Sequence, residues 1–425
     1  MKCRKRSAAW LIVALAGLLA GSFPAAAQEV DVWAWWDPTP QQLIGFEQYV
    51  GAKVNFRNVP FGEFPQQLIV AIAGGASPDV IFVDMNWFDD FADQNALLDL
   101  SPYVERNPHR LPIDDLFPVA RELWERDGRQ LAFSTSVSIA LSWYNKSMLD
   151  ELGLMPPDES FDWNQWIDYA GKATRDLNGD GTYDRKGLMD WWYEIATLIW
   201  SNGGEIFRNG QLALDTPEVE EALNFYKQFY DYEILVRPGE LAHVGYDNPE
   251  VAWRNGAVLF APGGTWVGPT TIRNQFTGEW AFDPGVAHVP MSPNGGRVGY
   301  AVGTGIAVAA GTDDPDLAWK ALSFFLDDDY QTLLARDGLL PARSSIATSN
   351  DFLPVESLPL DKNVIISAVA YQRPPDAGVR WSQTFGNPGS PAKSTFRAYF
   401  QGEVSFAAAM DNIRTQVNAI LSGNR

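Results

Sequence analysis

Residues Val30–Trp36 read V-D-V-W-A-W-W, a short apolar stretch rich in β-branched and aromatic side chains. Such a run is typical of a strand buried on both faces of a mostly parallel sheet. Pro38 follows almost at once, so the strand should end near Asp37. Because ligands of open α/β sheets bind beyond the carboxyl ends of the strands, Trp35, Trp36 and Asp37 are candidate contacts for the apolar face and hydroxyls of a sugar. The alternative is that these tryptophans are ordinary core residues.

The same pattern recurs in the stretch Ala76–Trp87, which reads A-S-P-D-V-I-F-V-D-M-N-W. Val80–Val83 predicts another buried strand, with three further candidate contacts at its carboxyl end. A helix, a strand and a helix are expected between the two buried strands, and this alternation predicts an α/β fold with a doubly wound parallel sheet. The three candidates are Asp84, Asn86 and Trp87.

Met1–Ala27 is expected to be a signal peptide. It has a basic start, an apolar run that is too short for a membrane span, and the small-residue site Ala25–Ala27 before Gln28. Cleavage near Ala27 predicts export, with the periplasm as the destination. The single cysteine, Cys3, would leave with this segment, so no disulfide framework is expected.

The composition excludes several classes of function. The formal net charge is −21, and the expected signal peptide carries four of the basic residues, so binding to nucleic acid or to an anionic membrane is not expected. The three histidines, His109, His243 and His288, are scattered and lack zinc-ligand spacing. No nucleophile elbow, H-E-x-x-H motif or P-loop occurs. These features predict a protein without catalytic activity. Seventeen tryptophans indicate either an unusual core or aromatic platforms for a ligand.

Residues 176–187 begin like a calcium loop, with candidate oxygen ligands at positions one, three, five and nine. Position twelve is Gly187, where a bidentate glutamate is needed. The alternatives are a calcium site completed by a distant carboxylate and a solvated turn rich in Asx residues. The candidate ligands are Asp176, Asn178, Asp180 and Asp184.

Six motifs occur in an order that is known from one protein family. They are A-G-G-A-S-P-D-V-I-F (Ala73–Phe82), W-Y-N-K-S-M-L (Trp143–Leu149), S-N-G-G-E-I (Ser201–Ile206), N-G-A-V-L-F-A-P-G-G-T-W (Asn255–Trp266), A-W-K-A-L-S-F-F-L (Ala318–Leu326) and G-L-L-P-A-R (Gly338–Arg343). In this order the chain resembles the extracellular solute-binding proteins of ABC importers, in the large sugar-binding family that includes maltose-binding protein.

The resemblance implies a two-lobed, type II periplasmic-binding-protein fold. Each lobe would be a doubly wound sheet with helices on both faces, and the ligand would bind in the cleft between the lobes. Residues 28–136 and about 300–341 would form the first lobe, and residues 137–299 and about 342–425 the second. Closure would be a hinge motion around the ligand.

The resemblance also assigns roles in the cleft. Carboxylates and amides would bind hydroxyl groups, and indole faces would cover the apolar side of a pyranose. Packing in the core is the alternative for the aromatic residues, and pairing with an acid is the alternative for Arg343. The residues are Trp35, Trp36, Asp37, Glu63, Phe64, Asp84, Asn86, Trp87, Tyr144, Trp191, Trp192, Tyr193, Gly264, Trp266, Tyr300, Gly303, Arg343 and Trp381.

The expected function is that of a monomeric periplasmic substrate-binding protein, which delivers a mono- or oligosaccharide to an ABC permease without a cofactor. One alternative is a secreted glycoside hydrolase, because aromatic platforms and carboxylates also suit the cleavage of carbohydrate. Another is a binder of a non-sugar polyol. No cluster of lysine and arginine at the expected cleft favours a phosphate ligand.

Overall fold

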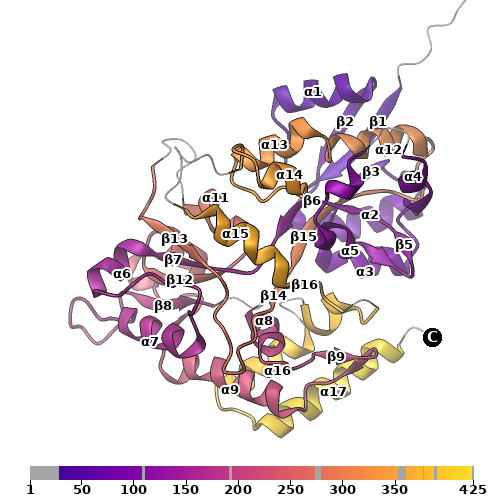
Figure 1. The fold of residues 1–425 in the computed structure, drawn as a ribbon. Coiled ribbons are helices and arrows are strands. Elements are labelled where there is room, and N and C mark those ends of the chain that lie inside the picture. The colour runs from indigo at the N-terminus through magenta and orange to yellow at the C-terminus, as the bar shows by residue number, and fades with distance from the viewer. Residues whose placement is uncertain are drawn as a thin grey trace, which may run out of the picture.

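The computed structural model describes residues 28–107, 111–190, 194–272, 279–352, 360–376, 378–386 and 390–423. The expected signal peptide, His109 and the candidate contacts Trp191, Trp192 and Tyr193 lie outside these ranges. The described chain forms two α/β bodies, and each is built around its own five-stranded sheet (Figure 1).

The first body is built on the sheet order β2-β1-β3-β15-β6. The first three of these strands run parallel to one another, whereas β15 runs antiparallel to both β3 and β6. The elements are β1 (Glu29–Ala34), α1 (Pro40–Val50), β2 (Lys53–Asn58), α2 (Phe64–Ala73), β3 (Val80–Asp84), α3 (Met85–Asp93), α4 (Ser101–Arg106), α5 (Pro118–Glu122), β6 (Phe133–Ser138), β15 (Val302–Val308), α12 (Pro315–Phe324) and α13 (Asp328–Arg336).

The second body is built on the sheet order β11-β8-β12-β7-β13. Strands β11, β8 and β12 are parallel, and β7 runs antiparallel to β12 and β13. The elements are β7 (Leu141–Asn145), α6 (Lys146–Leu152), α7 (Trp163–Ala173), β8 (Lys186–Met189), α8 (Glu194–Ser201), α9 (Pro217–Asp231), β11 (Leu235–Val236), α10 (Pro249–Arg254), β12 (Val258–Gly263), α11 (Pro269–Ile272), β13 (Pro284–Ala287), α15 (Lys362–Ala368), α16 (Pro391–Phe400) and α17 (Phe406–Ser422).

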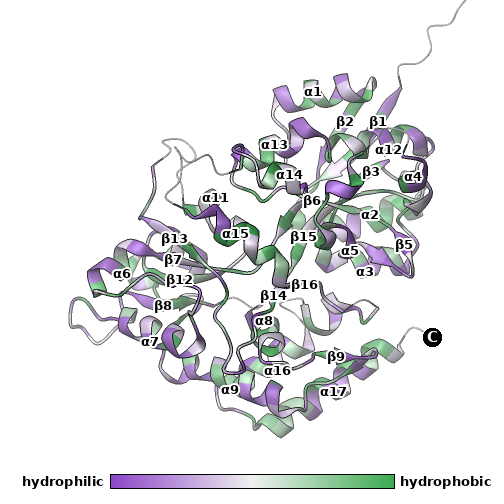
Figure 2. Cartoon of the chain, in the orientation of Figure 1, coloured by the Kyte–Doolittle hydropathy of each residue, from purple (hydrophilic) through white to green (hydrophobic). Residues whose placement is uncertain are grey.

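The strands, helices and α/β class predicted around Val30–Trp36 are confirmed, with one difference in strand direction. The β-α-β-α-β start does give three parallel strands, but each completed sheet is mixed because a strand from a distant part of the chain enters it in the opposite direction. The central strands are apolar and the outer helices α7 and α17 alternate in hydropathy (Figure 2). This is the distribution expected when sheets form the cores and helices cover them.

Strand β1 ends at Ala34, two residues before the end of the apolar stretch Val30–Trp36. Val30, Val32 and Ala34 are fully buried, whereas Trp35 and Trp36 lie in a bend and are partly exposed. Helix α1 begins soon afterwards with a capping box, in which Thr39 and Gln42 bond to each other's backbone. The bend therefore carries both indoles beyond the edge of the sheet.

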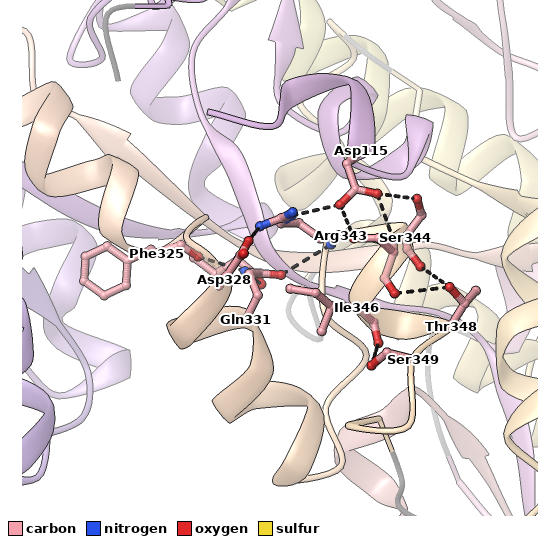
Figure 3. Close-up of polar contacts among 11 residues, drawn as sticks. Asp115, Phe325, Asp328, Gln331, Arg343, Ser344, Ile346, Thr348 and Ser349 are labelled. Atoms are coloured by element: carbon pink, nitrogen blue, oxygen red, sulfur yellow. Dashed lines mark hydrogen bonds and ion pairs between the residues drawn. The ribbon is translucent and has the colours of Figure 1, made fainter. Parts of the chain in front are cut away.

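The first body continues past residue 341, the point at which we expected the chain to leave it. The short helix α14 (Ser344–Ala347) follows Arg343, and this segment bonds to Asp115 (Figure 3). The other expected lobe limits remain predictions. None of the helices in the described ranges is both long enough and apolar enough to cross a membrane.

Candidate functional site

A cavity of about 590 Å³ lies between the two bodies. The ends of β3, β6 and β15 supply its wall in the first body, and the turn after β12 and the start of α16 supply part of its wall in the second. A volume of this size suits a small-molecule ligand. The lining residues are Phe61, Asp84, Met85, Asn86, Ser136, Ser138, Asp190, Trp266, Val302, Gly303, Thr304, Leu339 and Lys393.

The aromatic wall of the first body is a layered cluster with Phe61 in front. Phe61 lines the cavity and is 46% exposed. Trp35 packs behind it, with ring centroids 5.4 Å apart, and makes edge contacts at 5.3 Å with both Trp36 and Trp87. Phe64 is fully buried beneath the cluster. The partly buried tryptophans therefore support the ring that faces the cavity.

The polar wall of the first body is set by the junction between β3 and α3. Asp84 caps α3 by accepting a hydrogen bond from the backbone N–H of Asn86 at 2.9 Å. Burial raises the pKa of Asp84, and its hydrogen bonds with Asn86 oppose that shift. Asp84 and Asn86 both line the cavity, as the sequence predicts for side chains at the end of this strand.

Asp190 and Lys393 add charged groups from the second body. The Asp190 carboxylate accepts a hydrogen bond from the Tyr226 hydroxyl at 2.8 Å. Burial lowers the pKa of Lys393, and the attraction of Asp190 opposes that shift. Among the described residues that line the cavity, Lys393 is the single basic side chain.

Trp266 faces the cavity from the short helix Thr265–Val267. Its position depends on Gly264, because a Cβ at this residue would lie 1.9 Å from a ring carbon of Trp266. The Gly264 carbonyl also accepts a hydrogen bond from Trp143 Nε1 at 2.9 Å. The double glycine therefore lets the indole fold against its own backbone.

Several predicted contacts do not line the cavity. Tyr144 is buried in the sheet of the second body, where it packs against Phe260. Trp381 is also buried, and its Nε1 donates a hydrogen bond to the Tyr300 hydroxyl at 2.7 Å. Both residues therefore lie in the core, which is the alternative given above for the aromatic candidates.

The polar candidates Asp37 and Glu63 are exposed and bonded within the first body. Asp37 accepts a hydrogen bond from Asn58 Nδ2 at 2.8 Å, and Glu63 accepts one from Gln67 Nε2 at the same distance. Neither lines the cavity. Both remain predictions as ligand contacts.

Arg343 lies in an ion-pair network on the first body (Figure 3). Its Nε donates to Asp115 at 2.9 Å, and a second nitrogen pairs with Asp328. Asp115 also accepts hydrogen bonds from Ser344 and Ser345. Arg343 therefore pairs with acidic side chains, which is the alternative to a ligand contact given above.

Sequence reasoning missed most of the remaining lining residues. Helix α16 begins at Pro391, because Ser390 caps it. This cap places Lys393 in the first turn of the helix, where it lines the cavity. Asp190 directly precedes Trp191 and Trp192, which are predicted contacts, so its place in the sequence was the signal that could have identified it. The other missed residues are Phe61, Met85, Ser136, Ser138, Val302, Thr304 and Leu339.

The loop at residues 176–184 is held by its own hydrogen bonds. The Asp176 carboxylate accepts from the backbone N–H groups of Gly179 and Gly181, at 2.6 and 2.8 Å. Asp184 accepts from Leu177 N–H at 2.7 Å. Within the described residues, no group of three or more His, Cys, Asp or Glu side chains is arranged to hold a metal ion. Of the two alternatives given for this loop, the geometry matches the solvated, Asx-rich turn.

Two α/β bodies with a cavity of mixed polarity between them define the class of two-lobed solute-binding proteins. The model of the family "Bacterial extracellular solute-binding protein" matches residues 18–332, and this chain belongs to that family.

Individual relatives and solved structures are similar over most of the chain. An arabinooligosaccharide-binding protein from Halalkalibacterium halodurans is 26% identical over 312 residues, which cover 70% of this chain and 65% of the relative. An ABC substrate-binding protein from Listeria monocytogenes, solved in complex with cycloalternan, has a TM-score of 0.79 at 21% identity and covers 93% of this chain and 99% of its own. The sugar-binding protein MalE from Xanthomonas citri has a TM-score of 0.76 at 20% identity, with coverage of 94% and 98%. The two structures establish the likeness of the fold.

Proposed function

We propose that this protein binds a mono- or oligosaccharide in the cavity between its lobes and delivers it to the membrane permease of an ABC importer. It acts as a monomer in the periplasm, after removal of residues 1–27, and performs no chemistry on its ligand. The observation that carries the proposal is that Phe61 and Trp266, from different bodies, line one cavity together with carboxyl, amide and hydroxyl side chains.

The two kinds of lining residue fit the two kinds of surface on a sugar. The Phe61 and Trp266 rings cover the C–H faces of pyranose or furanose rings. Asp84, Asn86 and Asp190 fix the hydroxyl groups by directed hydrogen bonds. Because these contacts come from both lobes, a bound sugar stabilises the closed arrangement, and closure by a hinge motion is the signal to the permease.

Hydrolysis of a sugar is the alternative, because Asp84 and Asp190 are two carboxyl groups in one cavity. Burial raises the pKa of Asp84, which is also a property of a general acid. The family match favours binding over hydrolysis, since the matched family consists of solute-binding proteins. A polyol would use the same hydrogen-bonding groups but gain less from the aromatic rings.

The test is a ligand panel that contains maltotriose, an arabino-oligosaccharide, diacetylchitobiose and ribitol. We measure the Tm of the mature protein with each compound and analyse the mixture for products by chromatography. A ligand at a hundred times its Kd stabilises the folded state by about 2.7 kcal/mol, which raises the Tm by several degrees. A rise in Tm with an unchanged sugar supports binding. Product formation shows a hydrolase, a response to ribitol alone shows a polyol binder, and no response to any compound overturns the proposal.

A further inference from the structure

A second, much smaller cavity lies beside the main one and shares Trp266 with it. Its volume is about 10 Å³, close to the space that a single water molecule or hydroxyl group occupies. Trp266 and Val302 line both cavities, so the two share a wall. Tyr300 and Gly264, two predicted contacts that do not line the main cavity, line this one.

Two polar side chains of helix α8 point into this small cavity. Glu194 and Thr197 are three residues apart, so they lie on one face of the helix. They are only 3% and 2% exposed. Among the described residues, neither Glu194 Oε1 nor Thr197 Oγ1 has a hydrogen-bond partner. Buried polar atoms without partners destabilise a fold, so their position here calls for a ligand atom.

The protonation state of Glu194 suits such a ligand. Burial raises the pKa of Glu194 to about 8, so its carboxyl group is largely neutral at pH 7. A neutral carboxylic acid both donates and accepts hydrogen bonds, and a threonine hydroxyl does the same. A hydroxyl group has both a donor and an acceptor, so it can satisfy both side chains.

We propose that Glu194 and Thr197 form a hydroxyl-binding floor beneath Trp266, which takes one O–H group during ligand binding. The O–H group is either a hydroxyl of the sugar itself or a water molecule that bridges the floor to the sugar. This inference rests on the proposed function, because it deepens the same binding site. It adds a requirement for specificity: a bound sugar must present a hydroxyl group to the floor, directly or through the water molecule.

The test compares three variants with a matched control. Glu194→Met and Thr197→Val keep the approximate shape of each side chain but remove its hydrogen-bonding groups, whereas Glu194→Gln keeps such groups. The control is Ile199→Val, a small change at a fully buried apolar residue of the same helix. For each protein we measure the Tm without ligand, and by calorimetry the affinity for the panel sugar that binds the wild type best.

The inference makes opposite predictions for affinity and stability. Glu194→Met and Thr197→Val should lower sugar affinity at least tenfold, while the Tm without ligand stays the same or rises because an unpartnered polar group is removed. Glu194→Gln should restore most of the affinity lost in Glu194→Met. Ile199→Val should lower the Tm slightly and leave affinity unchanged.

Failure of this inference can be told apart from failure of the proposed function. If the wild type binds a sugar and Glu194→Met binds it equally well, the hydroxyl-binding floor is wrong and the proposed function stands. If the wild type binds no sugar of the panel, the proposed function fails. The Tm without ligand then tests the floor by itself. A lower Tm in both Glu194→Met and Thr197→Val would show that the two side chains only stabilise the fold, and it would overturn the floor.

Deoxy sugars identify the sugar hydroxyl that contacts the floor, directly or through a bridging water molecule. When the sugar hydroxyl binds the floor directly, one deoxy analogue loses affinity for the wild type but not for Glu194→Met. When a water molecule bridges, the analogue that lacks the bridged hydroxyl also loses affinity for the wild type but not for Glu194→Met, because the water bonds to that hydroxyl. If every analogue loses the same factor in the wild type and in Glu194→Met, no sugar hydroxyl is coupled to Glu194, and the floor is overturned.

Discussion

The indole of Trp266 lies so close to Gly264 that any side chain at position 264 would overlap it. A Cβ on Gly264 would stand 1.9 Å from Cζ3 of Trp266, well inside the contact distance of two carbon atoms. The backbone at Gly264 is extended, so the need for glycine here comes from the ring and not from the φ angle. The position of the aromatic face in the cavity therefore depends on the absence of one methyl group.

We expect Gly264→Ala to turn the Trp266 ring out of its position and to lower sugar affinity about tenfold. Isothermal titration calorimetry with the best sugar of the panel measures the effect. Gly45→Ala is the control, because a Cβ at Gly45 in helix α1 meets no atom within 4 Å and alanine favours the helix. Equal affinity for wild type and Gly264→Ala would show that the ring has room to move without loss of binding.

Trp266→Ala removes the aromatic face itself. Truncation of a stacking tryptophan in a cleft costs about 1.5–3 kcal/mol, so we expect affinity to fall 10- to 150-fold. Tyr232→Ala is the control, since Tyr232 is 61% exposed and lies outside the cavity lining. The outcome that counts against stacking is a Trp266→Ala variant with the calorimetric Kd of the wild type.

Arg343→Ala should lower stability without changing sugar affinity. The Arg343 side chain is 11% exposed and its removal leaves Asp115 without its charged partner, so we expect a loss on the order of 2 kcal/mol in urea unfolding. Arg336→Ala is matched to it, because Arg336 pairs with Asp351 at the exposed surface, where the loss should be about 0.5 kcal/mol or less. A large loss of sugar affinity in Arg343→Ala would instead show that this residue contacts the ligand.

The same network sets a dependence of stability on pH. Burial alone would raise the pKa of Asp115, but hydrogen bonds from Ser345, Ser344 and Arg343 outweigh it and lower the pKa below the ordinary value. The network therefore contributes stability above the unfolded pKa of the carboxyl group and loses it as pH falls through the lower, folded value. Asp115→Asn should unfold with a smaller dependence on acid pH than the wild type. Identical acid unfolding curves would contradict this account.

The loop at residues 176–184 should keep its shape without calcium. Asp176 bonds to two backbone N–H groups of the loop, so Asp176→Ala should reduce stability by about 1 kcal/mol in the absence of any metal. The Tm of the wild type should be the same in millimolar calcium chloride as in millimolar magnesium chloride. A calcium-specific rise in Tm that disappears in Asp176→Ala would establish the calcium site in place of the turn.

Much of the fold was predictable because its signals are local. Val30, Val32 and Ala34 form an apolar run, Thr39 and Pro40 mark a helix start, and each of these follows from neighbouring residues alone. Asp84 and Asn86 were predictable in the same way, because a residue at the carboxyl end of a parallel strand lies at the ligand edge of its sheet. Strand direction was not predictable where β15 joins β3 from more than two hundred residues away.

The sequence by itself determined the class of fold, the order of its motifs and the strand ends that face the cleft. Only the tertiary structure decided which side chains meet there. It brought Phe61, Asp190 and Lys393 to the cavity and left Tyr144 and Trp381 in the core. The physical reason is that a cleft is formed by surfaces distant in sequence, and the exposure of an aromatic ring depends on what packs behind it.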